Sequence, residues 1–88
     1  MAAKVEIYTS WGCPYCVSAK ALLDRKGVDY AEYDVGMGGE KRAEMLERVP
    51  GAWTVPQILI DNVAVGGSDD IHALDRAGKL DALLGLQT

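Results

Sequence analysis

The stretch that decides the fold is Val5-Glu6-Ile7-Tyr8-Thr9-Ser10-Trp11-Gly12-Cys13-Pro14-Tyr15-Cys16, which holds both cysteines of the chain. A strand-like run over residues 4–8 comes first, and a helical pattern over residues 14–26 follows the first cysteine. Proline suits the first helical position because its missing N–H would have no partner there, so Cys13 should lie at or near the N-cap. Two thiols at this spacing, on a strand-to-helix turn, can close into a disulfide and reopen.

The positions of the two cysteines predict different roles. Cys13 faces the unpaired N–H groups and the positive end of the helix dipole, which favour the thiolate, the form that attacks disulfides. Cys16 is one turn further along and shares a stripe with Ala19 and Leu23 at helical spacing, so it should face the core. We therefore expect Cys13 to be the nucleophile and Cys16 to be the recessed thiol that resolves a mixed disulfide.

Two other roles for the cysteine pair are weaker. A permanent bridge over two intervening residues closes a very small loop and stabilises little. A zinc site needs about four ligands, and the chain offers two cysteines and one histidine, His72. Redox chemistry is therefore the favoured function of the pair, with no metal expected.

Length and charge exclude several classes of function. The 88 residues predict one domain, residues 1–88, and the net charge of −4 without a Lys/Arg cluster argues against nucleic acid as a partner. No apolar stretch approaches membrane-spanning length, and the N-terminus has no hydrophobic secretory core. We expect a cytoplasmic protein, and in that reducing compartment a CxxC pair is more often catalytic than structural.

The rest of the chain predicts a small α/β fold. Strand patterns cover residues 29–35, 57–60 and 63–65, and Asp61-Asn62 suits a tight hairpin turn between the last two. A short helix places Met45, Leu46 and Val49 on one side, another begins with Ser68 or Asp69 as its cap and ends near Ala77, and a final helical turn carries Leu80, Leu83 and Leu84. The order β-α-β-α-β-β-α predicts a four-stranded mixed sheet flanked by helices.

Three motifs together resemble the glutaredoxins, the glutathione-dependent members of the thioredoxin superfamily. They are Cys13-Pro14-Tyr15-Cys16, Thr54-Val55-Pro56-Gln57 and Gly66-Gly67-Ser68-Asp69-Asp70. In this order and at these distances they cover essentially the whole chain, and they are most similar to the bacterial dithiol class. The resemblance implies a thioredoxin-like fold and glutathione as the reducing co-substrate.

The second motif, by this resemblance, binds the middle of glutathione. Thr54, Val55 and Pro56 are then ligand-binding residues, with a cis Val55–Pro56 bond opposite Cys13 and the Val55 backbone pairing with glutathione as a strand edge would. The residues alone also fit an ordinary trans proline that begins an edge strand.

The third motif resembles the site for the γ-glutamyl end of glutathione. Gly67 lets the backbone approach the ligand, helix N–H groups with Ser68 favour its carboxylate, and Asp69 receives its ammonium. Ser68 and Asp69 are also good N-cap residues whatever they bind, and both interpretations can hold at once. Asp70 is interpreted as an acid that complements the helix dipole.

Two further residues near the cysteines have alternative interpretations. Tyr15 lines the glutathione groove by resemblance and could equally be a packing aromatic. Lys20, about two turns from Cys13, either supports the thiolate electrostatically or is a solvated lysine.

The chain departs from the family pattern at two positions. Many glutaredoxins have a lysine three residues before the first cysteine, where it helps to bind the glycine carboxylate of glutathione, and here that residue is Ser10. Trp53 stands where a polar residue is frequent. We expect weaker binding of that carboxylate or its binding by another cation such as Arg48, with Trp11 and Trp53 as an apolar rim.

The resemblance implies a monomeric thiol–disulfide oxidoreductase. Cys13 attacks a glutathione mixed disulfide or a protein disulfide, and either glutathione or Cys16 resolves the product. Glutathionylated or disulfide-containing proteins are the implied partners. The alternative is a [2Fe–2S] cluster-binding module, in which two subunits each contribute a thiolate and a glutathione. Pro14 is unfavourable for this role, because such modules usually have glycine or serine after the first cysteine.

Overall fold

The computed structural model describes residues 3–86. Its strands are β1 (Val5–Thr9), β2 (Ala31–Asp34), β3 (Gln57–Ile60) and β4 (Val63–Gly66). Its helices are α1 (Pro14–Arg25), α2 (Gly39–Arg48), α3 (Ser68–Arg76) and α4 (Leu80–Leu83). The predicted α/β class and element order are confirmed, and the final helical turn forms the short helix α4.

The four strands form one mixed sheet in the order β2-β1-β3-β4. β1 is parallel to β2, and helix α1 connects them. β3 is antiparallel to both of its neighbours, β1 and β4. Asp61 and Asn62 join β3 to β4 with φ angles of 51° and 68°, which is the left-handed conformation that the sequence predicts for this hairpin turn.

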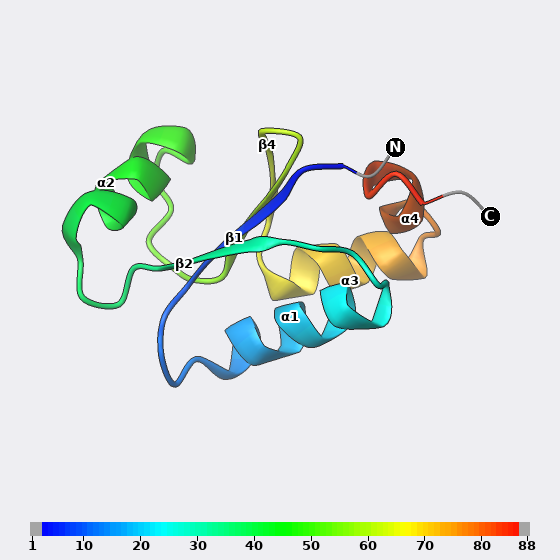
Figure 1. Ribbon diagram of the computed structural model, residues 1–88, viewed down its shortest axis with the longest axis horizontal. Coiled ribbons are helices and arrows are strands. Elements are labelled where there is room, and N and C mark those ends of the chain that lie inside the picture. Colours follow the sequence, from blue (N-terminus) through cyan, green and yellow to red (C-terminus); the bar gives the residue numbers. More distant parts are fainter. Residues whose placement is uncertain (1–2, 87–88) are drawn as a thin grey trace.

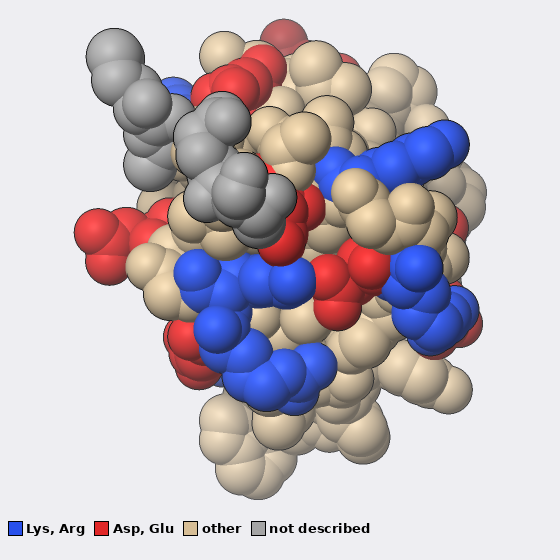
Figure 2. Space-filling model, turned by 90° about the vertical axis from the view of Figure 1, so that its right-hand side faces the viewer, with Lys and Arg blue, Asp and Glu red and all other residues tan. Residues whose placement is uncertain are grey.

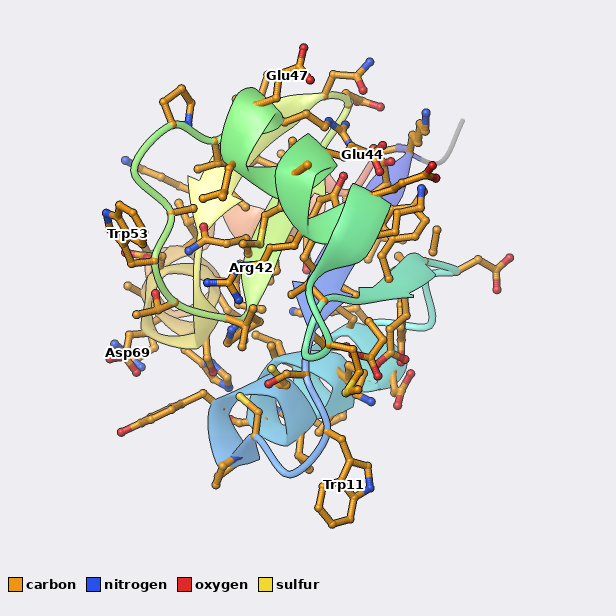
Figure 3. The ribbon with its side chains drawn as sticks, turned by 90° about the vertical axis from the view of Figure 1, so that its left-hand side faces the viewer. Trp11, Arg42, Glu44, Glu47, Trp53 and Asp69 are labelled. Atoms are coloured by element: carbon orange, nitrogen blue, oxygen red, sulfur yellow. The ribbon has the colours of Figure 1, made fainter. Side chains whose placement is uncertain are left out.

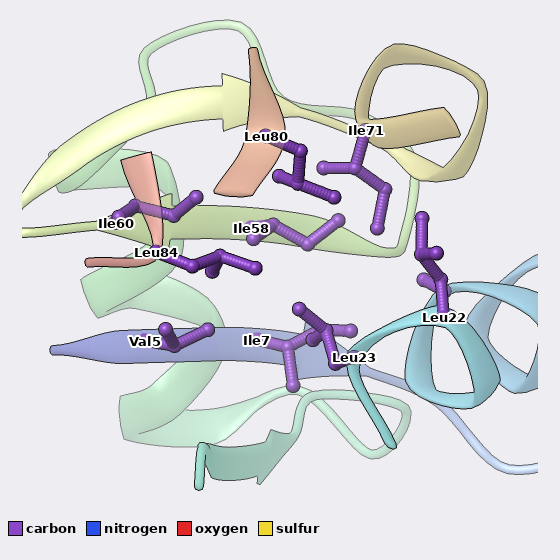
Figure 4. Packing of buried hydrophobic residues seen from close by; sticks show 10 residues of the cluster. Val5, Ile7, Leu22, Leu23, Ile58, Ile60, Ile71, Leu80 and Leu84 are labelled. Atoms are coloured by element: carbon purple, nitrogen blue, oxygen red, sulfur yellow. The ribbon is translucent and has the colours of Figure 1, made fainter. Parts of the chain in front are cut away.

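Helices cover both faces of the sheet, with α1 and α3 on one side and α2 on the other (Figure 1). The larger core cluster joins the inner sides of β1 and β3 to α1, α3 and α4 (Figure 4). Its members include Val5, Ile7, Leu22, Leu23, Ile58, Ile60, Ile71, Leu80 and Leu84. A smaller cluster lies under α2 and contains Tyr8, Val35, Met45, Ala52 and Leu59, which confirms Met45 as a core residue.

The central position of β1 buries a charge that strand alternation alone would place on a free face. All five residues of β1 are buried, Glu6 among them at 3% exposure. Arg48 at the end of α2 donates two hydrogen bonds to Glu6, Nη1 to Oε2 at 2.9 Å and Nη2 to Oε1 at 2.8 Å. Tyr33 Oη donates a third at 3.0 Å. These contacts fasten α2 to the sheet.

The start of α3 differs from the prediction. The N-cap is Gly67 rather than Ser68 or Asp69, which are the first two helical residues. Asp70, the third helical residue, reaches back, and its Oδ2 accepts the Gly67 N–H at 2.8 Å. Asp70 therefore supplies the half of a capping box in which the third helical residue bonds the N–H of the cap, and Gly67 has no side chain to bond the N–H groups of the first turn. Strand β2 is also shorter than the predicted range 29–35.

The helices and the surface charges agree with what the sequence predicts about membranes and nucleic acid. In residues 3–86 no helix has the length and apolar character needed to cross a bilayer. Figure 2 shows lysine and arginine side chains interspersed with acidic ones on the face that it presents. Among the ion pairs of the described residues, Lys26 Nζ lies 2.6 Å from Asp75 Oδ1 and 2.7 Å from Asp81 Oδ1.

Candidate active site

The two cysteines lie at the start of α1, as the sequence predicts. Cys13 is the N-cap with extended backbone angles, and Pro14 is the first helical residue. The backbone N–H of Cys16 donates to the Cys13 sulfur at 3.1 Å. This contact and the helix dipole both favour negative charge on that sulfur.

Cys16 is the recessed member of the pair. It is 2% exposed, and Ala19 and Leu23 on the same stripe are fully buried, which confirms the predicted core-facing position. Burial raises the pKa of the Cys16 thiol to about 12, and the hydrogen bond with Cys13 acts in the same direction. Both thiols are free, and Cys13 is the partly exposed one, so an incoming disulfide meets Cys13 first.

The segment before β3 faces the exposed cysteine. The Val55–Pro56 bond is cis, which agrees with the family resemblance and excludes the trans alternative. The Cys13 thiol donates to the Val55 carbonyl oxygen at a sulfur–oxygen distance of 3.7 Å. A main-chain group of residue 55 is thereby placed beside the reactive sulfur, where an extended ligand could pair with it.

A cavity of about 350 Å³ runs from this segment to the start of α3. Tyr15 and the residues of the second and third motifs that the family resemblance assigns to glutathione binding all line it. Its lining residues are Tyr15, Thr54, Val55, Pro56, Gln57, Gly66, Gly67, Ser68, Asp69 and Asp70. These residues come from three separate segments of the chain, and only the fold brings them together.

A second cavity of about 410 Å³ lies on the other side of the same segment. Thr54 and Val55 line both cavities, so the two hollows meet at the residues that face Cys13. The second one also contains Ser10, Arg42 and the two tryptophans. Trp11 and Trp53 are 94% and 79% exposed, and both side chains extend outward from the molecule in Figure 3.

The cation available near Ser10 is Arg42, and the expectation of Arg48 is wrong. Arg48 is committed to Glu6, to the Tyr8 hydroxyl at 2.8 Å and to Asn62 at 3.0 Å. Arg42 lines the second cavity, and within residues 3–86 it has no acidic partner at ion-pair distance. Sequence patterning offers no signal for this choice, because both arginines lie on α2.

Lys20 is neither isolated nor simply solvated. Its Nζ lies 2.9 Å from Glu32 Oε2 on β2, and the same oxygen accepts the Thr9 hydroxyl at 2.8 Å. Together with both cysteines these residues line a third cavity of about 300 Å³. The arrangement places the Lys20–Glu32 ion pair in the same cavity as the two thiols.

Comparison with known proteins agrees with this geometry. The family model described as Glutaredoxin matches residues 5–65. A glutaredoxin of Pseudomonas aeruginosa is 60% identical over 80 residues, which are 91% of this chain and 94% of that protein. The solution structure of glutaredoxin from Brucella melitensis has 53% identity and a TM-score of 0.80, and the match covers 99% of this chain and 96% of that one.

A more distant structure contains the tripeptide ligand. The crystal structure of a buckwheat glutaredoxin–glutathione complex is 26% identical with a TM-score of 0.82, and the match covers 94% of this chain and 77% of that one. The curated relative, the family match and the paired thiols at the helix start agree with one another. The chain therefore belongs to the glutaredoxin family, and it is a thiol–disulfide oxidoreductase that works through its cysteine pair.

Proposed function

We propose that this protein uses glutathione as its reducing co-substrate and acts on glutathione mixed disulfides and protein disulfides. The observation that carries the proposal is the pair of cavities that meet at Thr54 and Val55, beside the Cys13 sulfur. A tripeptide has two charged ends and a thiol in the middle. The site offers partners in the same order: the start of α3 for one charged end, Val55 and Cys13 for the middle, and the second cavity for the other end.

The γ-glutamyl end would lie at the start of α3. The first-turn N–H groups and the Ser68 hydroxyl can receive a carboxylate, and the Asp69 carboxylate can receive an ammonium. The Asp70 carboxylate already accepts a hydrogen bond from the Gly67 N–H, so Asp70 would shape the turn rather than contact the ligand. The middle of the tripeptide would pair with the Val55 backbone, which places its sulfur at Cys13.

The glycine end would lie in the second cavity. Its carboxylate would meet Arg42, which takes the place of the lysine that many relatives have where this chain has Ser10. Trp11 and Trp53 would form the exposed walls. Cys13 thiolate then attacks the mixed disulfide, and a second glutathione or the Cys16 thiol releases the product.

We propose that the protein works as a monomer in a reducing cytoplasm, where glutaredoxin potentials of roughly −200 to −230 mV let a glutathione pool keep the pair largely reduced. Pro14 after Cys13 and the family match favour this function over binding of a [2Fe–2S] cluster.

A glutathione-coupled assay on a small mixed disulfide tests the proposal. Cys13→Ser should abolish activity, because a serine hydroxyl does not ionise near neutral pH, whereas Cys16→Ser should retain it, since this route needs one thiol plus free glutathione. Reduction of a protein disulfide should require both cysteines. Activity that persists in Cys13→Ser would contradict the assignment.

Two substitutions test the ligand ends. Asp69→Asn and Arg42→Met should each raise the KM for glutathione by about fivefold, since an exposed charge-assisted contact is worth on the order of 1 kcal/mol. Asp29→Asn and Arg25→Met remove the same charges outside the three cavities and serve as controls. Equal effects in the test and control variants would refute specific binding at these ends.

A further inference from the structure

The resolving thiol Cys16 needs a partner that the CxxC turn does not provide. It must lose a proton before it can attack, yet it is almost fully buried. Burial and the neighbouring Cys13 raise its pKa, while a backbone hydrogen bond with Ser10 and, to a smaller extent, the positive charge of Lys20 lower it. Lys20 follows Cys16 by four residues on α1, so the two side chains share one face of the helix.

The third cavity places these groups around one water-accessible space of about 300 Å³. The titratable groups that line it are Cys13, Cys16, Lys20, Glu32 and Asp34. Lys20 is the single cation among them. Because Cys16 lines this cavity, a water molecule there can take up the thiol proton while a substrate covers Cys13.

The position of the Lys20 ammonium is fixed by two residues of the sheet. Thr9 is 3% exposed and donates its hydroxyl to Glu32 Oε2 at 2.8 Å. The same oxygen accepts Lys20 Nζ at 2.9 Å. Lys20 and Thr9 also lower the pKa of Glu32, so the carboxylate stays charged and acts as a tether rather than as a base.

We propose that Lys20, held by Glu32 and Thr9, stabilises the thiolate of Cys16 during the resolving step. The inference deepens the thiol–disulfide exchange described above, and it concerns closure of the cysteine pair rather than attack by Cys13. In this step the Cys16 thiol loses its proton to water, and its thiolate forms a bond with the Cys13 sulfur. The bond between Cys13 and the substrate sulfur breaks, and the leaving thiolate takes up a proton. The cysteine pair is oxidised and the substrate thiol is reduced.

The expected magnitude follows from two opposing effects. Removal of a nearby opposite charge raises a thiol pKa by about one unit, which lowers the thiolate fraction about tenfold at neutral pH. A more basic thiolate is also more nucleophilic, with a Brønsted coefficient of about 0.4–0.5. Closure in Lys20→Met should therefore be about threefold slower at neutral pH, and its pH–rate profile should move to higher pH. A structural defect alone would also slow closure in Lys20→Arg, which keeps the charge.

The test measures ring closure directly. The mixed disulfide of Cys13 with 2-mercaptoethanol is prepared in acid, the pH is raised, and the released thiol is followed at several pH values. Lys20→Arg keeps the charge and should close at nearly the rate of the unmodified protein. Lys79→Met is the matched control, because Lys79 is the N-cap of α4 and lies outside the cavity. Glutathione takes no part, so this result and the glutathione proposal stand or fall separately.

Three outcomes would overturn the inference. The first is an unchanged closure rate and pH profile in Lys20→Met, and the second is an equal loss in Lys79→Met. The third comes from the Cys16→Ser background, where only Cys13 reacts. If Lys20→Met slowed the reaction of Cys13 with a mixed disulfide there by as much as it slows closure, the charge would serve Cys13 instead.

Discussion

The Glu6→Gln substitution should destabilise the protein strongly and in a pH-dependent way. Hydrogen bonds from Arg48 lower the pKa of Glu6 from 4.5 to about 2, with Tyr33 adding to the effect and burial opposing it. At about 1.36 kcal/mol per pKa unit, this difference corresponds to about 3 kcal/mol of stability at neutral pH. The Arg48 side chain is 21% exposed, so solvent screening should reduce the loss to about 2 kcal/mol.

The sign of the pH dependence follows from the lowered pKa. A carboxyl group whose pKa is lower in the folded state stabilises the fold above its unfolded pKa and loses that contribution as the pH falls through its folded pKa. The contribution of Glu6 should be complete above about pH 5, about half lost near pH 3 and absent below about pH 2. Glutamine has no such titration, so the two proteins should converge in stability as the pH falls.

Urea unfolding followed by circular dichroism at pH 7 and pH 3 measures both effects. Tryptophan fluorescence is a poor probe, since Trp11 and Trp53 are already exposed in the folded state. A thermal scan at pH 7 should give a melting temperature for Glu6→Gln that is lower by roughly 10 °C. Glu44→Gln, which breaks the exposed Lys41–Glu44 pair, is the control and should change little. A stability difference that is the same at both pH values would refute the reasoning.

Two other predictions concern the cysteine pair and the glycine that precedes the start of α3. Iodoacetamide at neutral pH should label Cys13 well before Cys16, because Cys16 is 2% exposed and its pKa is raised to about 12. Peptide mass spectrometry gives the order of labelling. Earlier labelling of Cys16 would reverse the assigned roles. Gly66 and Gly38 both have positive φ, so an alanine at either position strains the backbone. Only at Gly66 would the added Cβ also overlap the Asp70 side chain. Gly66→Ala should therefore lower the free energy of unfolding by at least about 1 kcal/mol more than Gly38→Ala, and it should raise the KM for glutathione. Equal losses in urea unfolding would show that backbone strain alone accounts for the effect.

Features that depend on neighbouring residues were predictable from the sequence. Helix α1 starts at Pro14 after the Cys13 cap, because these two residues suit a helix start wherever it occurs. Asp61 and Asn62 form the hairpin turn because they tolerate positive φ. The recessed position of Cys16 followed from helical spacing alone.

Features that depend on which side chains meet across the fold were decided by the tertiary structure. Helical spacing did not indicate that Arg48 neutralises Glu6 while Arg42 lines the cavity beside Ser10. Nor did it show that Asp70 would accept the N–H of Gly67. It gave no sign that Lys20 and Thr9 would share one oxygen of Glu32. An ion pair depends on distances of a few ångströms between side chains, and those distances are set when β1 is buried between two layers of helices.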